Sequence, residues 1–151
     1  EMGPRAEEAD VAWREARIAK QINDFEGRKS ISYSAFDGDE LIGMVGLLPI
    51  WRRGQFKLSY WIRPAAQRKG YGMECVGAIV VFSFQALDAR LVTTGHAEPN
   101  IGSARLAQRI GFSQVARQPL ACEMPDETLV AGIGYAVEDD THLRSHVVTW
   151  H

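Results

Sequence analysis

The chain has 151 residues, of which 46% are hydrophobic and 24% charged, a balance typical of one globular domain with its own core. Its formal net charge of −2 argues against a nucleic-acid-binding module, which would usually be basic. No apolar stretch approaches the roughly 20 residues of a membrane span, and the first residues lack the features of a secretory signal. We therefore expect a single cytoplasmic domain over residues 1–151, with no nucleic-acid or membrane partner.

The first half of the sequence predicts one helix followed by three strands. Residues 6–25 place Val11, Ile18, Ile22 and Phe25 at helical spacing on one side. Three stretches with the apolar pattern of strands follow, joined by short turns, at residues 30–36, 41–50 and 56–62. The third of them carries its larger apolar side chains on one face, at Phe56, Leu58, Tyr60 and Ile62. Short turns between successive strands predict an antiparallel meander.

The second half alternates helices with strands. A helical stripe runs from Met73 to Leu87, a short strand follows at residues 90–96, and a second stripe runs from Ser103 to Ile110. Gly111 stands where a left-handed residue would end that helix. "AGIGYA" at 131–136 lacks the third glycine and the following helix of a dinucleotide fingerprint, so we expect it to pack as a strand. Together these elements predict a mixed α/β sheet.

The stretch "QRKGYG", residues 67–72, joins the third strand to the following helix. Pro64 keeps Arg63 extended, and the glycines allow backbone geometry and close approach that side chains would block. Backbone N–H groups at the start of a helix form an anion site, and Arg63, Arg68 and Lys69 add positive charge. The loop therefore predicts a site for an anionic cofactor with a pyrophosphate. The alternative is a plain strand-to-helix turn with solvated basic residues.

A second polar pair opens the helix near residue 103. Asn100 is a good N-cap candidate, and Ser103 lies on the same stripe as Leu106 and Ile110. A buried hydroxyl without a partner costs about 1–3 kcal/mol, so Ser103 must find one. Either it bonds a carbonyl of the preceding turn, or Asn100 and Ser103 point into a cleft at the ends of two strands.

Together these stretches resemble the GNAT superfamily of acyl-CoA-dependent N-acyltransferases. Residues 67–72 are similar to its Gln/Arg-x-x-Gly-x-Gly/Ala signature, and "NIGSARLAQRIGF", residues 100–112, to its Asn-x-x-Ser helix ending in Gly-Phe. Residues 42–62 and the closing "LRSHVVTWH", residues 143–151, resemble the Rim-type branch, which acetylates the N-termini of ribosomal proteins. The resemblance covers residues 30–115 well and both ends loosely.

The resemblance implies a fold and an activity. The expected fold is a mixed α+β arrangement with a splayed, mostly antiparallel mixed sheet flanked by helices, in which acyl-CoA enters where two central strands part. The expected activity is transfer of an acetyl group from acetyl-CoA to a primary amine, by direct attack in a ternary complex. The acceptor would be a protein or peptide N-terminus or a small-molecule amine. The alternative is a GNAT-like module that binds acyl-CoA or an assembly partner without efficient transfer.

Site residues follow from the same resemblance. The strand end would pair with the pantetheine of acetyl-CoA, the loop would hold the pyrophosphate, and the Asn-x-x-Ser helix would meet the pantetheine arm and sulfur. The cofactor-binding residues are thus Trp61, Ile62, Arg63, Gln67, Arg68, Lys69, Gly70, Tyr71, Gly72, Asn100 and Ser103. Ser103 is also the catalytic candidate for protonating the leaving thiolate. Glu123 is the first candidate for the base that deprotonates the amine, and His96 is held in reserve.

The sequence departs from the family at three places. Lys57 and Ser59 stand near the position where many relatives carry an acidic residue, which puts the usual base in doubt. Residues 125–140 exceed the short turn expected there and predict an additional strand. The family's first strand and helix would precede the helix at 6–25. Either the chain is a fragment or shortened variant, or the segment around 128–138 fills the vacant sheet edge. An uncovered edge would favour a homodimer.

The remaining polar residues predict no metal site. The four histidines and two cysteines show no metal-ligand spacing. Cys75 and Cys122 are interpreted as core thiols in a reducing compartment, with a disulfide between them as the alternative. Residues 51–53, a tryptophan and two arginines, are either one wall of the acceptor site or a solvated hairpin turn.

Overall fold

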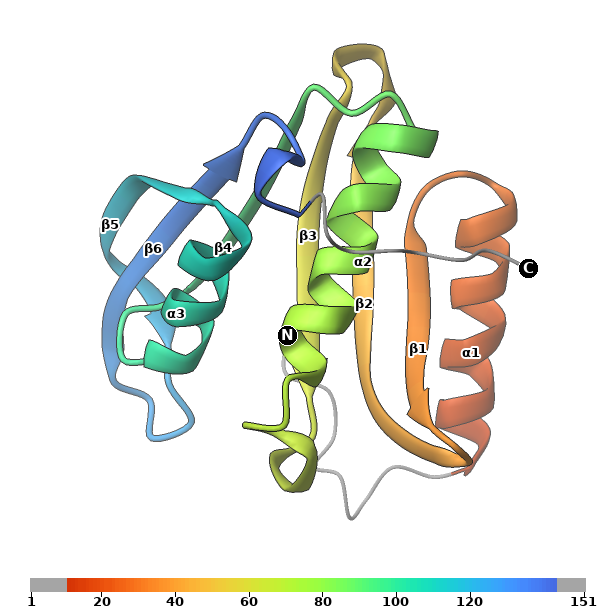
Figure 1. Ribbon diagram of the computed structural model, residues 1–151. Coiled ribbons are helices and arrows are strands. Elements are labelled where there is room, and N and C mark those ends of the chain that lie inside the picture. Colours follow the sequence, from red (N-terminus) through yellow and green to blue (C-terminus); the bar gives the residue numbers. More distant parts are fainter. Residues whose placement is uncertain (1–10, 144–151) are drawn as a thin grey trace.

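The computed structural model describes residues 11–143 (Figure 1). The predicted start of the first helix and all but the first residue of the closing stretch at 143–151 lie outside the described residues. The helices are α1 (Val11–Glu26), α2 (Tyr71–Ala86) and α3 (Ile101–Ile110). The strands are β1 (Ile31–Asp37), β2 (Glu40–Ile50), β3 (Gln55–Ile62), β4 (Leu91–Ala97), β5 (Ser113–Glu123) and β6 (Leu129–Val137). Short 3-10 turns lie at η1 (Trp51–Arg53), η2 (Pro64–Ala66) and η3 (Thr141–Leu143).

The described strands form one mixed sheet in the order β1-β2-β3-β4-β6-β5. β1, β2 and β3 are the predicted antiparallel meander, β3 and β4 pair in parallel, and β4, β6 and β5 are again antiparallel. The predicted fold class, a mostly antiparallel mixed sheet flanked by helices, is confirmed.

The extra strand predicted late in the chain exists as β6, but it does not fill a sheet edge. β6 lies between β4 and β5, because a tight turn, in which the Met124 N–H donates to the Thr128 carbonyl at 2.9 Å, folds it back along β5. The edges of the described sheet are β1 and β5. β5 is interrupted by Pro119 and by two register shifts, features that disfavour pairing with another chain. The homodimer stays a prediction.

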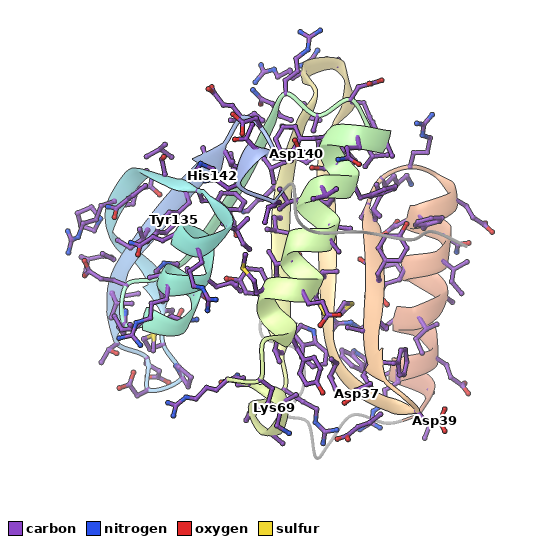
Figure 2. All side chains as sticks on the ribbon, in the orientation of Figure 1. Asp37, Asp39, Lys69, Tyr135, Asp140 and His142 are labelled. Carbon is purple, nitrogen blue, oxygen red and sulfur yellow. The ribbon has the colours of Figure 1, made fainter. Side chains whose placement is uncertain are left out.

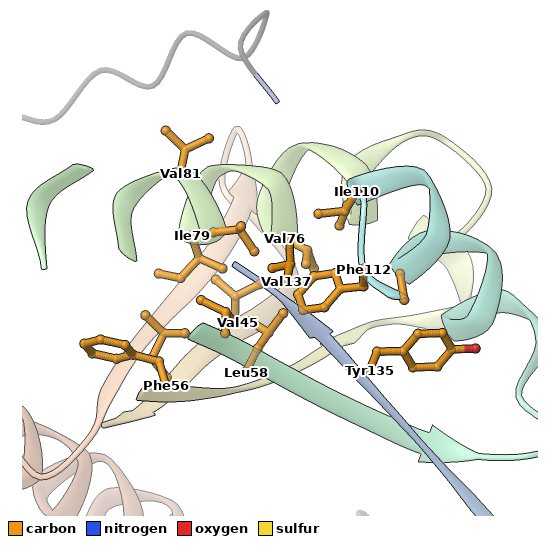
Figure 3. Packing of buried hydrophobic residues seen from close by; sticks show 14 of the residues in the cluster. Val45, Phe56, Leu58, Val76, Ile79, Val81, Ile110, Phe112, Tyr135 and Val137 are labelled. Carbon is orange, nitrogen blue, oxygen red and sulfur yellow. The ribbon is translucent and has the colours of Figure 1, made fainter. Parts of the chain in front are cut away.

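The core lies between the sheet and helices α2 and α3 (Figure 3). Val80 of α2 is fully buried, and Phe56 of β3 and Leu47 of β2 are each only 1% exposed. Burying one such side chain contributes roughly 1.5–3 kcal/mol. Ser83 is also fully buried, and its hydroxyl donates to the Val80 carbonyl at 2.7 Å, so it carries no unpaired polar group. α2 therefore holds β2 and β3 in place and fixes where the loop before it begins.

Helix α1 behaves differently from its sequence pattern. Its predicted apolar stripe stays in the open, with Val11 65% and Ile18 56% exposed, and no residue of the helix is buried by the described part of the chain. α1 lies beside β1 (Figure 1), where the Phe25 ring meets the Tyr33 ring edge-on at 6.2 Å between centroids. Helical periodicity thus predicted the helix correctly but not its burial.

Gly111 ends α3 and offers a test of the packing at that end. Its φ of 110° is left-handed, and a Cβ there would lie 2.6 Å from the His142 ring. Gly38 has φ 58° but open space around its Cβ position. Both alanine variants should lose roughly 1–2 kcal/mol of unfolding free energy from backbone strain, and Gly111→Ala should lose more because His142 must also move. Urea denaturation of the two variants measures the difference, and equal losses would contradict this packing.

Candidate active site

The sheet opens between its two central strands. β3 and β4 pair only from Gln55–Leu91 to Lys57–Thr93, although β3 continues to Ile62 and β4 to Ala97. Just past the last pair, the Thr94 hydroxyl donates to the Leu58 carbonyl at 3.2 Å. A side-chain hydrogen bond therefore follows directly after the last backbone pair between β3 and β4. Beyond this point the strands part, so the C-terminal half of β3 has no strand partner on that side among the described elements.

The loop "QRKGYG" lies at the end of β3, just before α2. Gly70 is the N-cap of α2, with φ 90° and no side-chain cap. The backbone N–H groups of residues 68–73 donate to no described acceptor. A Cβ placed on Gly70 would meet nothing within 4 Å. The loop therefore presents a run of free N–H donors, the positive end of a helix and open space, which together suit an anion.

Three side chains assigned to the cofactor from sequence also fasten the loop within the chain, and their contact with the cofactor stays a prediction. The Arg63 guanidinium donates to the Glu40 carboxylate at 2.8 Å, and the Gln67 amide donates to the Ile62 carbonyl at 2.9 Å. The Tyr71 hydroxyl bonds Asp37. These contacts tie the loop to β3 and to the β1–β2 turn. Figure 2 shows Asp37 and Lys69 at the same end of the molecule.

The two other basic side chains of the loop stay available. Arg68 and Lys69 form no salt bridge with any described carboxylate. Arg68 is itself left-handed, with φ 62°, which turns the backbone sharply just before the glycine. Positive charge at this place therefore comes from Arg68 and Lys69, whereas Arg63 is already neutralised by Glu40.

Gly72 has a packing role as well. A Cβ at this position would approach Cδ2 of Leu106 in α3 to 3.2 Å. The missing side chain lets α2 and α3 come close together, which brings the N-terminal end of α3 to the loop. Figure 1 shows the loop and this end of α3 at the same, lower end of the molecule.

Asn100 is the N-cap of α3, as its position in the sequence predicted. Its Oδ1 accepts the Ser103 N–H at 3.1 Å. The Ser103 side chain is half-buried, and its interaction with Tyr60 lowers the pKa of that phenol, so the two side chains lie near each other, one on α3 and the other on β3. Of the two interpretations of Ser103 left open by the sequence, this contact favours the one that faces the cleft.

Tyr60 is the site residue that the sequence did not single out. Burial raises the pKa of Tyr60 above its ordinary value near 10, the Ser103 hydrogen bond lowers it, and repulsion from Tyr135 raises it slightly. The net pKa is raised, so the phenol stays protonated at neutral pH. The strand pattern placed Tyr60 among core residues. A signal was present, because a tyrosine on a buried face needs a partner for its hydroxyl.

His96 of β4 completes the cluster. Its ring stacks on that of Tyr135 in β6, with 5.4 Å between centroids and 27° between planes. Nδ1 lies 2.8 Å from the Ala97 carbonyl, which can only accept, so Nδ1 carries the proton and Nε2 has a bare lone pair. Nε2 is buried and has no partner among the described residues. A buried acceptor without a donor is unusual and marks a place where a ligand or substrate group can bond.

Glu123 lies on β5, a strand that carries no residue of this cluster. It is exposed at the end of β5, opposite Leu129 of β6, and it forms no salt bridge with a described residue. A nearer carboxylate, Glu98, follows β4 directly but is held by Arg117 at 2.7 and 2.9 Å. The hydrogen bond from Arg117 lowers the pKa of Glu98, which makes it a weak proton acceptor.

Residues 51–53 lie at the opposite end of β3 from the loop. They precede β3, whereas the loop follows it, and eight residues of strand separate the two ends by about 25 Å. Trp61 lies at the strand end next to the loop and is 45% exposed. The interpretation of residues 51–53 as an acceptor wall stays a prediction.

No group of three or more His, Cys, Asp or Glu side chains in residues 11–143 is placed to hold a metal ion. Within the same range, no helix has the length and apolar character to cross a membrane. Cys75 and Cys122 are free thiols rather than a disulfide.

Most of the chain, including the loop, matches a known protein family. A family model described as the acetyltransferase (GNAT) domain matches residues 2–113. The chain belongs to the GNAT acetyltransferase family. Among curated proteins, no sequence matches this chain significantly. The parted strands, the glycine loop and the Asn100 cap are therefore features of a GNAT domain.

Solved structures share this GNAT fold at low identity. RimL, a ribosomal α-N-protein acetyltransferase in complex with coenzyme A, has a TM-score of 0.81 and 16% identity, with 87% of this chain and 75% of that chain covered. A spermidine N-acetyltransferase from Vibrio cholerae has a TM-score of 0.77 and 17% identity, with 96% of this chain and 86% of that chain covered. RimJ from Mycobacterium smegmatis, in complex with a CoA-disulfide, has a TM-score of 0.77 and 12% identity, with 89% of this chain and 68% of that chain covered. At these identities the likeness concerns the fold.

Proposed function

We propose that this GNAT domain transfers an acetyl group from acetyl-CoA to a primary amine, with a peptide N-terminus as the acceptor class and a small-molecule amine as the second choice. The observation that carries the proposal is the run of unpaired N–H groups at 68–73, which follows the half of β3 that has parted from β4. The Rim-type choice of acceptor rests on the sequence resemblance over residues 42–62. Amine-dependent release of the CoA thiol tests the transfer itself.

Acetyl-CoA would bind along the open edge of β3 and the loop. The free N–H groups and the Arg68 and Lys69 side chains suit its pyrophosphate. The half of β3 that has no partner on the β4 side, up to Trp61 and Ile62, offers backbone groups to the amides of pantetheine. Asn100 uses Oδ1 to cap α3, which leaves its NH₂ group available to the same arm.

The chemistry requires three proton movements: the ammonium loses one proton before attack, the nitrogen loses a second after the C–N bond has formed, and the departing thiolate gains one. The neutral amine attacks the thioester carbonyl, a C–N bond forms, the nitrogen releases its second proton to the base or to water, and the C–S bond breaks to release the CoA thiolate. We assign the proton for that thiolate to the Ser103 hydroxyl, backed by Tyr60, whose raised pKa keeps it a proton donor at neutral pH. The incoming ammonium must first lose a proton to a base.

Two side chains compete for the role of base. Glu123 was the candidate from sequence, and His96 gains support from its bare, unpartnered Nε2 and from its stacking on Tyr135, which in turn acts on the pKa of Tyr60. We expect His96→Gln to lower kcat by about 10²–10⁴-fold, because the amine then lacks a positioned base. Glu123→Gln is the matched variant and should leave kcat near the wild-type value. The opposite pattern would return the role to Glu123.

A further inference from the structure

A second concave feature lies at the other end of the sheet, where three chain segments meet. It is a hollow of about 340 Å³ lined by three arginines, Arg28, Arg52 and Arg90, together with Trp51 and Asp88. Arg28 follows α1, Arg52 lies in η1, and Arg90 precedes β4, so the three guanidinium groups come from distant parts of the sequence. Neither the loop at 67–72 nor the Tyr60 cluster contributes to it.

The walls of this arginine hollow are tied together. The Trp51 indole N–H donates to the Arg28 carbonyl at 2.7 Å, and the Arg28 guanidinium lies 4.7 Å from the centre of the Trp51 ring. The Arg90 N–H donates to the Gly54 carbonyl at 2.7 Å. The backbone is left-handed at Arg28 and Asp88, with φ 55° and 53°, which costs roughly 1–2 kcal/mol at each non-glycine residue. The segments are therefore held in position rather than loosely adjacent.

The hollow is positively charged in a chain whose net charge is −2. None of its three guanidinium groups forms a salt bridge with a carboxylate of residues 11–143. Asp88 offsets one positive charge, and the C-terminal end of α2 adds a partial negative charge of about one half. What remains is a surplus of about one and a half positive charges.

We propose that the arginine hollow binds a small molecule that carries a phosphate monoester. Such a group has a charge of about −1.5 to −2 at neutral pH, which matches the surplus, whereas a single carboxylate would leave part of it uncompensated. Guanidinium forks pair with phosphate oxygens in two-pronged hydrogen bonds. Trp51, 37% exposed, and half-buried Leu87 give an apolar wall for the rest of the molecule. The proposal does not depend on acetyl transfer.

Phenyl phosphate, titrated by calorimetry, is the probe for this site. The wild-type protein should bind it, and Arg52→Gln and Arg90→Gln should each weaken binding by about tenfold or more, because each removes a charge-assisted hydrogen bond. Arg53→Gln is the matched control: it removes the same charge from the neighbouring residue, which does not line the hollow, and should change affinity less than about threefold. CoA affinity, measured in parallel, should stay unchanged in all three variants.

Inorganic phosphate separates the two parts of the proposed ligand. It should bind in competition with phenyl phosphate but more weakly, because it lacks the apolar group that contacts Trp51. Equal affinity for the two probes would overturn the role of the apolar wall. Absence of phenyl phosphate binding at millimolar concentration, or equal loss in Arg52→Gln and Arg53→Gln, would overturn the site. Unchanged thermal unfolding of the variants shows that losses are local, as expected for exposed side chains.

Discussion

Replacing Gly70 with valine is expected to abolish binding of CoA while the domain stays folded. The Cβ position of Gly70 opens onto free space beside the unpaired N–H groups of residues 68–73, so a branched side chain would occupy the volume that a pyrophosphate needs. The φ of 90° adds backbone strain of roughly 1–2 kcal/mol, small against the 5–15 kcal/mol that a domain usually has. Isothermal calorimetry with CoA measures the loss.

Gly54→Val is the matched control for that experiment. Gly54 also has a positive φ, 61°, but it precedes β3 and so lies at the end of that strand opposite the loop. It carries a comparable strain and should keep CoA affinity within about threefold of wild type. A well-folded Gly70→Val protein with unchanged affinity would show that CoA does not approach this loop.

Removal of the Ser103 hydroxyl should lower kcat by about 10²–10⁴-fold and leave CoA affinity nearly unchanged, because a general acid acts on the departing thiolate rather than on the bound thioester. Tyr60→Phe should lower kcat in the same direction, since the Tyr60 phenol interacts with Ser103. If the two hydroxyls act as a unit, the double variant should lose less than the product of the single losses. Steady-state kinetics at saturating acetyl-CoA measure all three.

Ser83→Ala separates a catalytic role from a structural one. Ser83 is buried in α2, where its hydroxyl donates to the Val80 carbonyl at 2.7 Å, away from the opening of the sheet. Its removal should lower stability by about 0.5–1.5 kcal/mol and leave kcat unchanged. If Ser103→Ala behaved like Ser83→Ala, losing stability but not turnover, the hydroxyl of Ser103 would be a structural group.

Local signals in the sequence predicted the meander, the two later helices and the loop, because each depends on neighbouring residues. Strand alternation placed Phe56 and Leu58 in the core, and Asn100 and Gly111 mark the ends of α3 as their residue types suggest. The late segment predicted a strand, but not its place between β4 and β5. That position depends on which way a hairpin folds onto the sheet, and periodicity does not encode it.

Long-range partners explain the other differences. The sequence did not predict the partners of Arg63 and Tyr71 within the chain, because Glu40 and Asp37 lie more than 20 residues earlier, on either side of the β1–β2 turn. Tyr60 fits a strand pattern equally well as a core residue or as a site residue, and only its contact with Ser103 distinguishes the two. Helix propensity and spacing predict where a helix forms, but they do not determine which face of α1 is covered.

Amine-dependent release of CoA thiol from acetyl-CoA tests the central claim most directly. The measurement uses the full chain, a panel of peptides with free N-termini, the same peptides with blocked N-termini, and spermidine, with mass spectrometry of the products. We predict thiol release that requires a free amine, yields one acetylated amine per thiol, and is fastest with the peptides. Tight CoA binding without thiol release for any amine would contradict the claim and make the domain an acyl-CoA-binding module.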